Sequence, residues 1–508
     1  MMSQNEFGQL SQFNIDSGSV RKLSRAFCER HHVVLLGTFE PDHDEPVTVG
    51  MLDPTNTSLR LQIADLLQHP VTAVRLNQYE IETALKKAYG EHKTPDQIVI
   101  TDRPHTDGMT QPRHIMEHIL STAVREEASD IHIESFSQNV DLRFRIDGIM
   151  HQIYTDLSPN NVGDVIRVLK IWCDLDITEQ RRPQDGRLQC RIELEDRGPT
   201  SIDFRISIVP APAGEDVVIR ILDQEMGLMP VDALGMDEEL EETFLRLLNN
   251  PEGLILVTGP TGSGKTTTLY AALRQINDGR RKIITAEDPI EYDIDKISQK
   301  QITKQTPLPV LLRALLRQDP DVLLIGEIRD QVTGDTALAA ANTGHVVFAT
   351  VHTPDAIGTL TRLRGLELDA SELSDALLAV LSQRLVRRLC ESCATSGEIS
   401  DEHRELFGPL IEGFEVRTPV GCKKCHHVGY RGRVGLFELL VVDRPMQAMI
   451  ADGIAASELR TYAHEQGHRE LLDDALRRVT EGVISLDEVE RVVPYRQIRT
   501  ARRQCRKD

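Results

Sequence analysis

Between residues 231 and 385, short apolar runs alternate with longer amphipathic segments. The runs at 253–259, 282–287, 321–326 and 345–351 have few polar residues, as do strands buried on both faces. The intervening segments at 266–276, 309–318 and 335–344 have the spacing and length of helices. Strands that alternate with helices predict a mostly parallel sheet covered on both faces, so this region is predicted to be α/β.

Residues 113–224, which precede this region, have a different pattern of apolar and polar residues. In the segment 114–127 the apolar residues recur on one helical face. Apolar and polar residues then alternate at 130–135, 141–147, 187–194 and 201–209, as in strands with one buried face. Residues 113–224 are therefore predicted to form an α+β domain.

The remaining chain divides by composition. Residues 1–95 mix helical and strand-like patches and end with a short helix stopped by Gly90, and 96–112 is a linker rich in Pro, Thr and Asp. After the 231–385 core come a cysteine-containing module (386–440), a polar helical region (441–495) and a basic tail (496–508).

Composition and charge narrow the class of protein. The chain has 508 residues, too many for one core, and its net charge of −21 argues against a general nucleic-acid binder. The first residues are polar rather than basic and then apolar, and no apolar run reaches the ~18 residues of a membrane span. These features predict a cytoplasmic protein.

Four of the eight cysteines form two Cys-x-x-Cys pairs, Cys390 with Cys393 and Cys422 with Cys425. Two such pairs match a closed four-thiolate zinc site, which is structural because no coordination position stays open. A redox pair is the main alternative, although it needs only one such pair. His426 and His427 follow directly and are alternative ligands, or surface residues.

The strongest motif is GPTGSGKT, which lies between an apolar strand and a helix. In this phosphate-binding loop, backbone N–H groups surround the phosphates, the lysine reaches the β- and γ-phosphates and the final threonine binds Mg²⁺. The predicted ATP-binding residues are Gly259, Pro260, Thr261, Gly262, Ser263, Gly264, Lys265 and Thr266.

Further polar groups follow neighbouring strands. Glu287, Asp288 and Glu291 follow one strand, Glu327 another and His352 a third. Each has an ordinary alternative, such as a helix cap for Asp288, a surface ion pair for Glu291 or a core position for His352. Because ligand-binding groups gather at the carboxyl ends of parallel strands, these residues together favour a hydrolytic site.

Several motifs jointly resemble the type II secretion and type IV pilus-assembly ATPase family. The nucleotide motifs that carry the resemblance are GPTGSGKTTTLYAAL, TAEDPIEY, LRQDPDVLLIGEIRD and TGHVVFATVHTPDA. Upstream it extends to ASDIHIE, RFRIDG, RRPQDGR and GEDVVIRIL, and downstream to SQRLVRRLC, the cysteine pairs and GYRGRVGLFELL. The resemblance covers about residues 112–490 and implies a RecA-like P-loop ATPase core.

The resemblance also implies roles for individual residues. Glu287 would act as the base that polarises water, with Glu291 as second choice, and Glu327 would serve the Mg²⁺ ion. His352 would contact the γ-phosphate. Asp330 is interpreted as structural, either paired with Arg329 or capping the next helix.

Members of this family form hexameric rings in which arginines complete a neighbouring subunit's site. Arg205 and Arg220 match that role best; the alternative is a strand-surface arginine paired with a carboxylate. The resemblance thus implies a homohexameric ATPase at the cytoplasmic face of the bacterial inner membrane, powering pseudopilus or pilus assembly. Residues 1–95 would dock on inner-membrane assembly-platform proteins.

Two other functions remain open at this point. One is a motor for DNA uptake or conjugal transfer, which the acidic charge disfavours, since no nucleic-acid contact is expected. The other is a nucleotide-gated scaffold with little hydrolysis, which the intact set of Lys265, Glu287 and Glu327 disfavours. The motifs do not distinguish secretion from pilus assembly.

Overall fold

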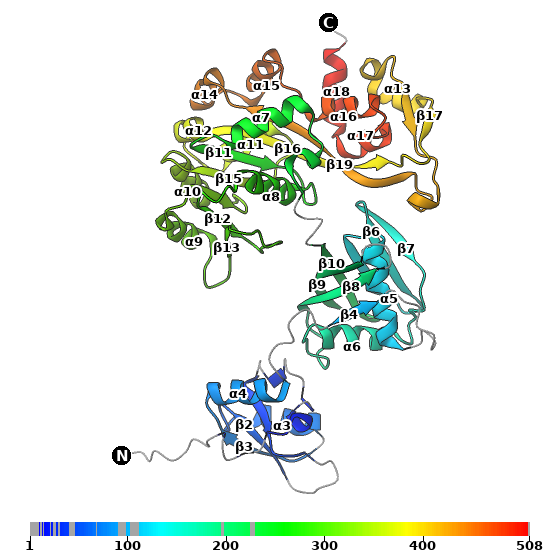
Figure 1. Ribbon diagram of the computed structural model, residues 1–508, viewed down its shortest axis with the longest axis vertical. Helices are drawn as coiled ribbons and strands as arrows, with labels where there is room; N and C mark the ends of the chain where they lie inside the picture. Colours follow the sequence, from blue (N-terminus) through cyan, green and yellow to red (C-terminus); the bar gives the residue numbers. More distant parts are fainter. Residues whose placement is uncertain are drawn as a thin grey trace. The chain divides into compact units, whose positions relative to one another are not determined.

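The computed structural model describes residues 10, 13, 15–20, 22–23, 27–28, 31–39, 46–67, 69–89, 98–101, 111–194, 198–223 and 229–505. The chain divides into two compact units, Met1–Gln224 and Glu225–Asp508 (Figure 1). Within the described residues, every helix is too short or too polar to cross a lipid bilayer.

The first unit begins with a small sheet. It has the order β1-β2-β3, with β1 antiparallel and β3 parallel to β2. Its elements are α1 (Ser17–Val20), β1 (Val33–Leu36), β2 (Val47–Met51), α3 (Thr57–Leu67), β3 (Val71–Arg75) and α4 (Gln78–Tyr89). Residues on α4 such as Ile81 and Leu85 are buried against the apolar strand β1, which gives this part its own hydrophobic core.

A seven-stranded sheet follows, in the order β4-β8-β9-β10-β5-β6-β7. Its elements are β4 (Val99–Thr101), α5 (Pro112–Arg125), β5 (Asp130–Ser135), β6 (Val140–Ile146), β7 (Ile149–Ile153), α6 (Val162–Trp172), β8 (Gln184–Leu194), β9 (Gly198–Ala211) and β10 (Gly214–Asp223). As the periodicity predicts, α5 buries its apolar face, and it packs against this sheet beside α6 (Figure 1).

Part of the predicted linker 96–112 has a different structure. The strand β4 pairs in parallel with β8, and Ile100 is buried in the core of this sheet. Residues 96–97 and 102–110 of that segment lie outside the described residues. The Pro- and Asp-rich flanks hide a three-residue strand that is too short to show a pattern of its own.

The second unit is built on a seven-stranded sheet with the order β13-β12-β14-β15-β11-β16-β19. Its first strands and helices are α7 (Glu238–Leu248), β11 (Gly253–Thr258), α8 (Lys265–Ile276), β12 (Ile283–Glu287), β13 (Ser298–Gln301), α9 (Leu308–Leu315), β14 (Val322–Ile325), α10 (Gln331–Ala341), β15 (Val346–Val351), α11 (Ala356–Gly365) and α12 (Ala370–Ala376). All neighbours pair in parallel except β16 and β19.

The apolar strand residues divide between the two faces of this sheet. Leu256 and Leu323 belong to one hydrophobic cluster, whereas Val257 and Leu324 belong to the other. Both faces are therefore covered, and the predicted α/β fold with a mostly parallel sheet is confirmed.

The predicted boundary between core and cysteine module, at 385/386, is wrong. β16 (Leu377–Leu389) and β19 (Tyr430–Val441) are long antiparallel partners within the core sheet. The module is inserted between them and contains β17 (Thr395–Gly397), α13 (Asp401–Phe407) and β18 (Val416–Thr418). β16 begins with an apolar run and ends with mixed residues, and residues 390–429 separate it from β19, so the pairing could not be recognised from local pattern.

The C-terminal region is helical, as predicted, from α14 (Arg444–Ala451) and α15 (Ala456–Glu465) to α16 (Leu471–Thr480) and α17 (Leu486–Val492). The last helix, α18 (Tyr495–Gln504), covers most of the predicted basic tail 496–508, and its Ile498 is buried. It packs beside α13 (Figure 1). Residues 506–508 lie outside the described residues.

Candidate active site and cysteine cluster

The phosphate-binding loop 259–264 joins β11 to α8, as predicted. Gly259, Gly262 and Gly264 have φ angles of 150°, 76° and 89°, which residues with a side chain rarely adopt. A Cβ atom at Gly259 would lie 2.5 Å from the backbone oxygen of Gln383. The Gln383 side chain in turn donates to the Ser263 carbonyl at 2.6 Å, so β16 supports the loop.

Lys265 lies at the start of α8, against the same loop. Its Nζ atom donates to the carbonyl oxygens of Gly259 at 2.9 Å and Pro260 at 3.0 Å. Burial lowers the pKa of Lys265, although the nearby Glu327 carboxylate opposes that shift. The ammonium group is thus held where phosphate oxygens would enter the loop.

The sheet order brings the predicted acidic and histidine positions together. From β12 through β14 and β15 to β11, neighbouring strands are parallel, so their carboxyl ends share one edge. Glu287 ends β12, Glu327 lies two residues beyond β14 and His352 directly follows β15. The phosphate-binding loop follows β11 at the same edge.

Glu327 lies between a histidine and an arginine. Arg329 donates to it through Nη2 at 2.7 Å, and His352 Nε2 lies 3.6 Å from the same carboxylate oxygen. The other ring nitrogen of His352 is 3.1 Å from the Gly259 carbonyl. His352 therefore links Glu327 to the phosphate-binding loop, and with 44% of its side chain exposed it is no core histidine.

Of the two structural roles predicted for Asp330, capping is confirmed. Its side chain accepts a hydrogen bond of 2.8 Å from the Thr333 N–H and caps α10. The other predicted role, an ion pair with Arg329, is not formed, because the Arg329 guanidinium bonds Glu327 instead. An N-cap position directs the carboxylate back toward its own helix.

Glu287 is 5% exposed and accepts three hydrogen bonds from protein side chains. Its Oε1 accepts from Thr285 Oγ1 at 2.5 Å and from Gln299 Nε2 at 3.2 Å. The Tyr270 hydroxyl donates to Oε2. Tyr270 comes from α8, one helical turn beyond Thr266, so the helix that begins at the phosphate-binding loop also contacts the candidate base.

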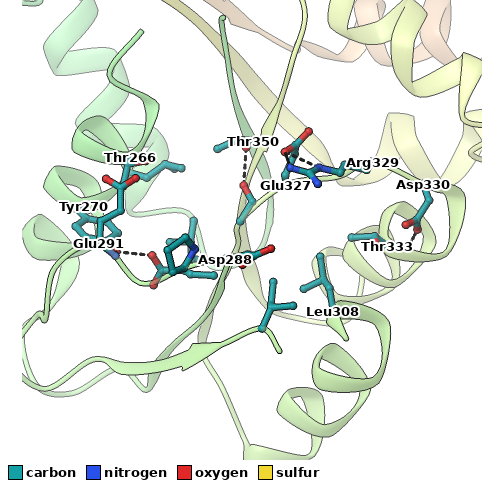
Figure 2. A pocket seen from close by; sticks show the side chains of 16 residues that line it. Thr266, Tyr270, Asp288, Glu291, Leu308, Glu327, Arg329, Asp330, Thr333 and Thr350 are labelled. Carbon is teal, nitrogen blue, oxygen red and sulfur yellow. Dashed lines mark hydrogen bonds and ion pairs between the residues drawn. The ribbon is translucent and has the colours of Figure 1, made fainter. Parts of the chain in front are cut away.

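A cavity of about 300 Å³ adjoins the loop. Figure 2 shows Tyr270 and Glu291 on one side of it, Glu327 and Arg329 on the other, and Asp288 between them. The acidic residues that line it are Glu287, Asp288, Glu291, Glu327 and Asp330, whereas Arg329 is its cationic residue. With Thr266 at its wall, this acidic cavity has the oxygen ligands that Mg²⁺ prefers.

Arg205 and Arg220 lie in the first unit, directly opposite each other on β9 and β10. Arg220 is 61% exposed, and its Nε lies 3.4 Å from an Asp130 oxygen. Arg187 on β8 continues the row beside Arg205 and pairs with Asp203. Arg187 and Arg220 are thus largely exposed and each pairs with a carboxylate. The contribution of Arg205 and Arg220 to a neighbouring subunit's site remains a prediction.

The four cysteines that were predicted to bind zinc are brought together. Their Sγ atoms all lie within 4.8 Å of one another, with Cys390–Cys422 at 3.9 Å and both Cys393–Cys425 and Cys422–Cys425 at 3.7 Å. Tetrahedral zinc with Zn–S bonds of about 2.3 Å requires S···S separations of about 3.8 Å. This set of donors fits zinc, and within the described part of the chain the cluster includes neither His426 nor His427.

Backbone geometry supports thiolate character at this site. The N–H groups of Cys422 and Gly429 point at Cys425 Sγ at 3.1 and 3.3 Å. Burial raises the pKa of the Cys425 thiol, but these two donors, together with hydrogen bonds from the Cys393 and Cys422 thiols, outweigh burial and lower it to about 6. A thiol deprotonated near neutral pH is ready to bind a metal.

The residues around Glu287 have no motif of their own in the sequence. The pattern predicts Tyr270 only as part of a helix and Thr285 only as part of a strand. Gln299 lies on the polar strand β13, SQKQ, which has no apolar pattern. The available signal was spacing, because Tyr270 and Thr266 are four residues apart and share a helix face.

Comparisons with known proteins agree with this arrangement. Residues 106–491 match the family described as Type II/IV secretion system protein, and residues 6–95 match the MshEN domain. The chain is 37% identical to the "Type II secretion system ATPase E" of Vibrio cholerae serotype O1, covering 93% of this chain and 97% of that protein. It is 34% identical to the "Type IV pilus assembly ATPase PilB" of Myxococcus xanthus, covering 94% and 87%.

Solved structures give a consistent result for the fold. The pilus retraction motor PilT with bound ADP is 27% identical, with a TM-score of 0.51, and the match covers 75% of this chain and 97% of PilT. The Legionella pneumophila ATPase DotB has a TM-score of 0.58 at 22% identity, covering 80% and 99%, which concerns the fold alone.

Proposed function

Since the chain belongs to the type II/IV secretion system protein family, we propose that it works as a homohexameric motor at the cytoplasmic face of the bacterial inner membrane. Its relatives over nearly the whole chain are ATPases of type II secretion and type IV pilus assembly, and it is an ATPase of this class. The motor would power the assembly of a pseudopilus or pilus. Residues 1–95 would bind membrane proteins of that machine.

One observation carries the catalytic part of the proposal, namely the gathering of four strand ends around the phosphate-binding loop. Lys265 would bind the β- and γ-phosphates of ATP, and Thr266 and Glu327 would hold Mg²⁺, which neutralises phosphate charge when bound. Glu287 would orient and deprotonate the attacking water, and His352 would contact the γ-phosphate from beside Glu327. Arg205 and Arg220 would complete a neighbouring subunit's site.

The cysteine cluster is proposed to hold one structural Zn²⁺ ion per chain. Its four sulfur atoms would leave no ligand position for a reaction, and three of the distances between them, 3.7, 3.7 and 3.9 Å, are close to those of a tetrahedral site. The ion would fix the ends of β16 and β19 where the inserted module leaves the core sheet.

Phosphate release by the purified full-length chain tests the proposal. ATP hydrolysis that requires Mg²⁺ and is abolished in Lys265→Ala is the expected result. Tight ATP binding without turnover in the wild-type protein would instead support the nucleotide-gated scaffold. Loss of the gene product in its bacterium should abolish either secretion or piliation, which distinguishes the two machines.

A further inference from the structure

Three side chains with no role assigned above, Tyr270, Thr285 and Gln299, donate hydrogen bonds to Glu287. We propose that Tyr270 is a positioning residue for hydrolysis, whose hydroxyl holds the Glu287 carboxylate and the loop 287–291 against the phosphate-binding helix. This inference rests on the proposed role of Glu287 as the base. Tyr270 is not among the residues proposed above to bind ATP or Mg²⁺, and its hydroxyl contacts Glu287, Glu291 and Gln299.

The Tyr270 hydroxyl both donates and accepts hydrogen bonds. It donates to Glu287 Oε2, and it accepts from the Glu291 N–H and from Gln299 Nε2, both at 3.4 Å. One hydroxyl group thus connects both ends of the acidic loop to α8. Because Tyr270 is only 1% exposed, water does not compete for these contacts.

The tyrosine is also held firmly as a donor. Burial first, and then the neighbouring Glu287 carboxylate, raise the pKa of Tyr270 far above its ordinary value, so the hydroxyl keeps its proton. The Tyr292 ring packs edge-on against it, with the ring centroids 6.1 Å apart. The hydroxyl therefore has one preferred direction.

The acceptor count explains what this arrangement does for catalysis. An ionised carboxylate offers about four acceptor positions, and Tyr270, Thr285 and Gln299 occupy three at Glu287. About one position is left for a water molecule. Holding three positions fixes the direction of the remaining one, which is how a base is aimed at its water.

The test is ATP hydrolysis by full-length Tyr270→Phe across ATP concentrations, which gives kcat and KM separately. We expect kcat to fall by about 10- to 100-fold, the range found when a supporting hydrogen bond is lost, with KM for ATP changed by less than about twofold. Thr285→Val removes a second donor to Glu287 with little change of shape and should likewise lower kcat with little change in KM. An unchanged kcat in folded Tyr270→Phe would overturn the inference.

Tyr462→Phe is the matched control. Its hydroxyl also donates to a carboxylate oxygen, that of Asp443 at 2.6 Å, but it lies on α15, outside the catalytic site. This variant should keep the wild-type kcat and KM for ATP. Thermal unfolding of all variants identifies any that are misfolded.

A second comparison separates this inference from the proposed function. In a Glu287→Gln background, adding Tyr270→Phe should lower the residual rate no further, because Tyr270 acts through that carboxylate. An equal loss in both backgrounds would reject positioning while leaving the ATPase intact. Wild-type protein without hydrolysis would instead reject the proposed function itself.

Discussion

At the residue scale, the carboxylates of the site have different surroundings. Glu287 is buried and accepts only from neutral groups, whereas Glu327 is bonded to Arg329 and lies near His352. The two carboxylates therefore differ in their partners, which are neutral donors at Glu287 and include a guanidinium at Glu327.

This difference predicts distinct effects of the substitutions Glu287→Gln and Glu327→Gln on ATP hydrolysis. Glu287→Gln should lower kcat by about 10²–10⁴, the usual contribution of a general base, while ATP and Mg²⁺ still bind. Glu327→Gln should lose activity and need more Mg²⁺ for half-maximal rate. Turnover measured across a Mg²⁺ titration separates them, and near-normal turnover in Glu287→Gln would mean that another group, with Glu291 the first candidate, is the base.

The sequence allowed part of this site to be predicted. The phosphate-binding loop and the cysteine pairs could be recognised because their chemistry lies in short contiguous motifs. The surroundings of Glu287 could not, because they depend on which side chains from three elements meet at one point. Strand β13 in particular consists of polar residues and is held by its pairing with β12 rather than by burial.

At the scale of elements, the C-terminal helix α17 is tied to the core strand β16 by a buried charge. Glu488 has a fully buried side chain and accepts from the Arg387 N–H at 2.7 Å and from the guanidinium groups of Arg387 and Arg491. Burial raises the pKa of Glu488, but Arg491 and then Arg387 outweigh it, and the net pKa is lowered.

This lowered pKa predicts how stability depends on pH. Because the folded-state pKa lies below the ordinary value of 4.5, the stabilisation is fully present above that value and is lost as pH falls through the folded pKa. Glu488→Gln should cost about 3 kcal/mol at pH 7, as for removing one partner of a buried ion pair. Hydrogen exchange of residues 471–498 in the full chain measures this cost.

The difference between variant and wild type should be constant above about pH 5 and shrink below it. Glu481→Gln is the control, since its carboxylate, which pairs with Arg477 and Arg478, is 40% exposed, whereas that of Glu488 is fully buried. A surface pair contributes at most ~1 kcal/mol. Equal losses of stability in the two variants would mean that the buried Glu488 ion pair stabilises the fold no more than the Glu481 pair does.

The inserted cysteine module should depend on its metal ion more than the core sheet does. Chelation or Cys422→Ser should remove about one zinc per chain and increase hydrogen exchange in residues 390–429. The long pairing of β16 with β19 should persist, because it lies in the core sheet. Cys505→Ser, an exposed thiol, should change neither quantity, and a metal-free wild-type chain of normal stability would reject the zinc site.

At the scale of the whole molecule, the candidate catalytic residues are distributed over two units. Lys265 and Glu287 belong to the second unit, whereas Arg205 and Arg220 belong to the first. Residues 224–228, which join the units, lie outside the described residues. The division itself agrees with the sequence pattern, in which half-buried strands give way to buried ones between 224 and 231.

This division permits a test of whether subunits share active sites. If Arg220 acts on a neighbour's phosphate, Lys265→Ala and Arg220→Ala chains will each be inactive alone. In mixed rings some interfaces combine an intact phosphate-binding loop with an intact arginine, so partial activity should return when the two are assembled together. An arginine on the transferring phosphoryl group contributes about 10³–10⁵ in rate, which makes even a small fraction of restored interfaces measurable.

Dilution provides the independent measurement. Monomers cannot complete a shared site, so specific activity of the wild-type chain should fall as subunits dissociate, and ATP, which favours the assembled form, should oppose that loss. Mixed rings without recovered activity leave two explanations, an arginine acting within its own chain or a ring whose subunits must all be intact. Activity that stays constant down to the monomer would exclude the second and show that each chain hydrolyses ATP with its own residues.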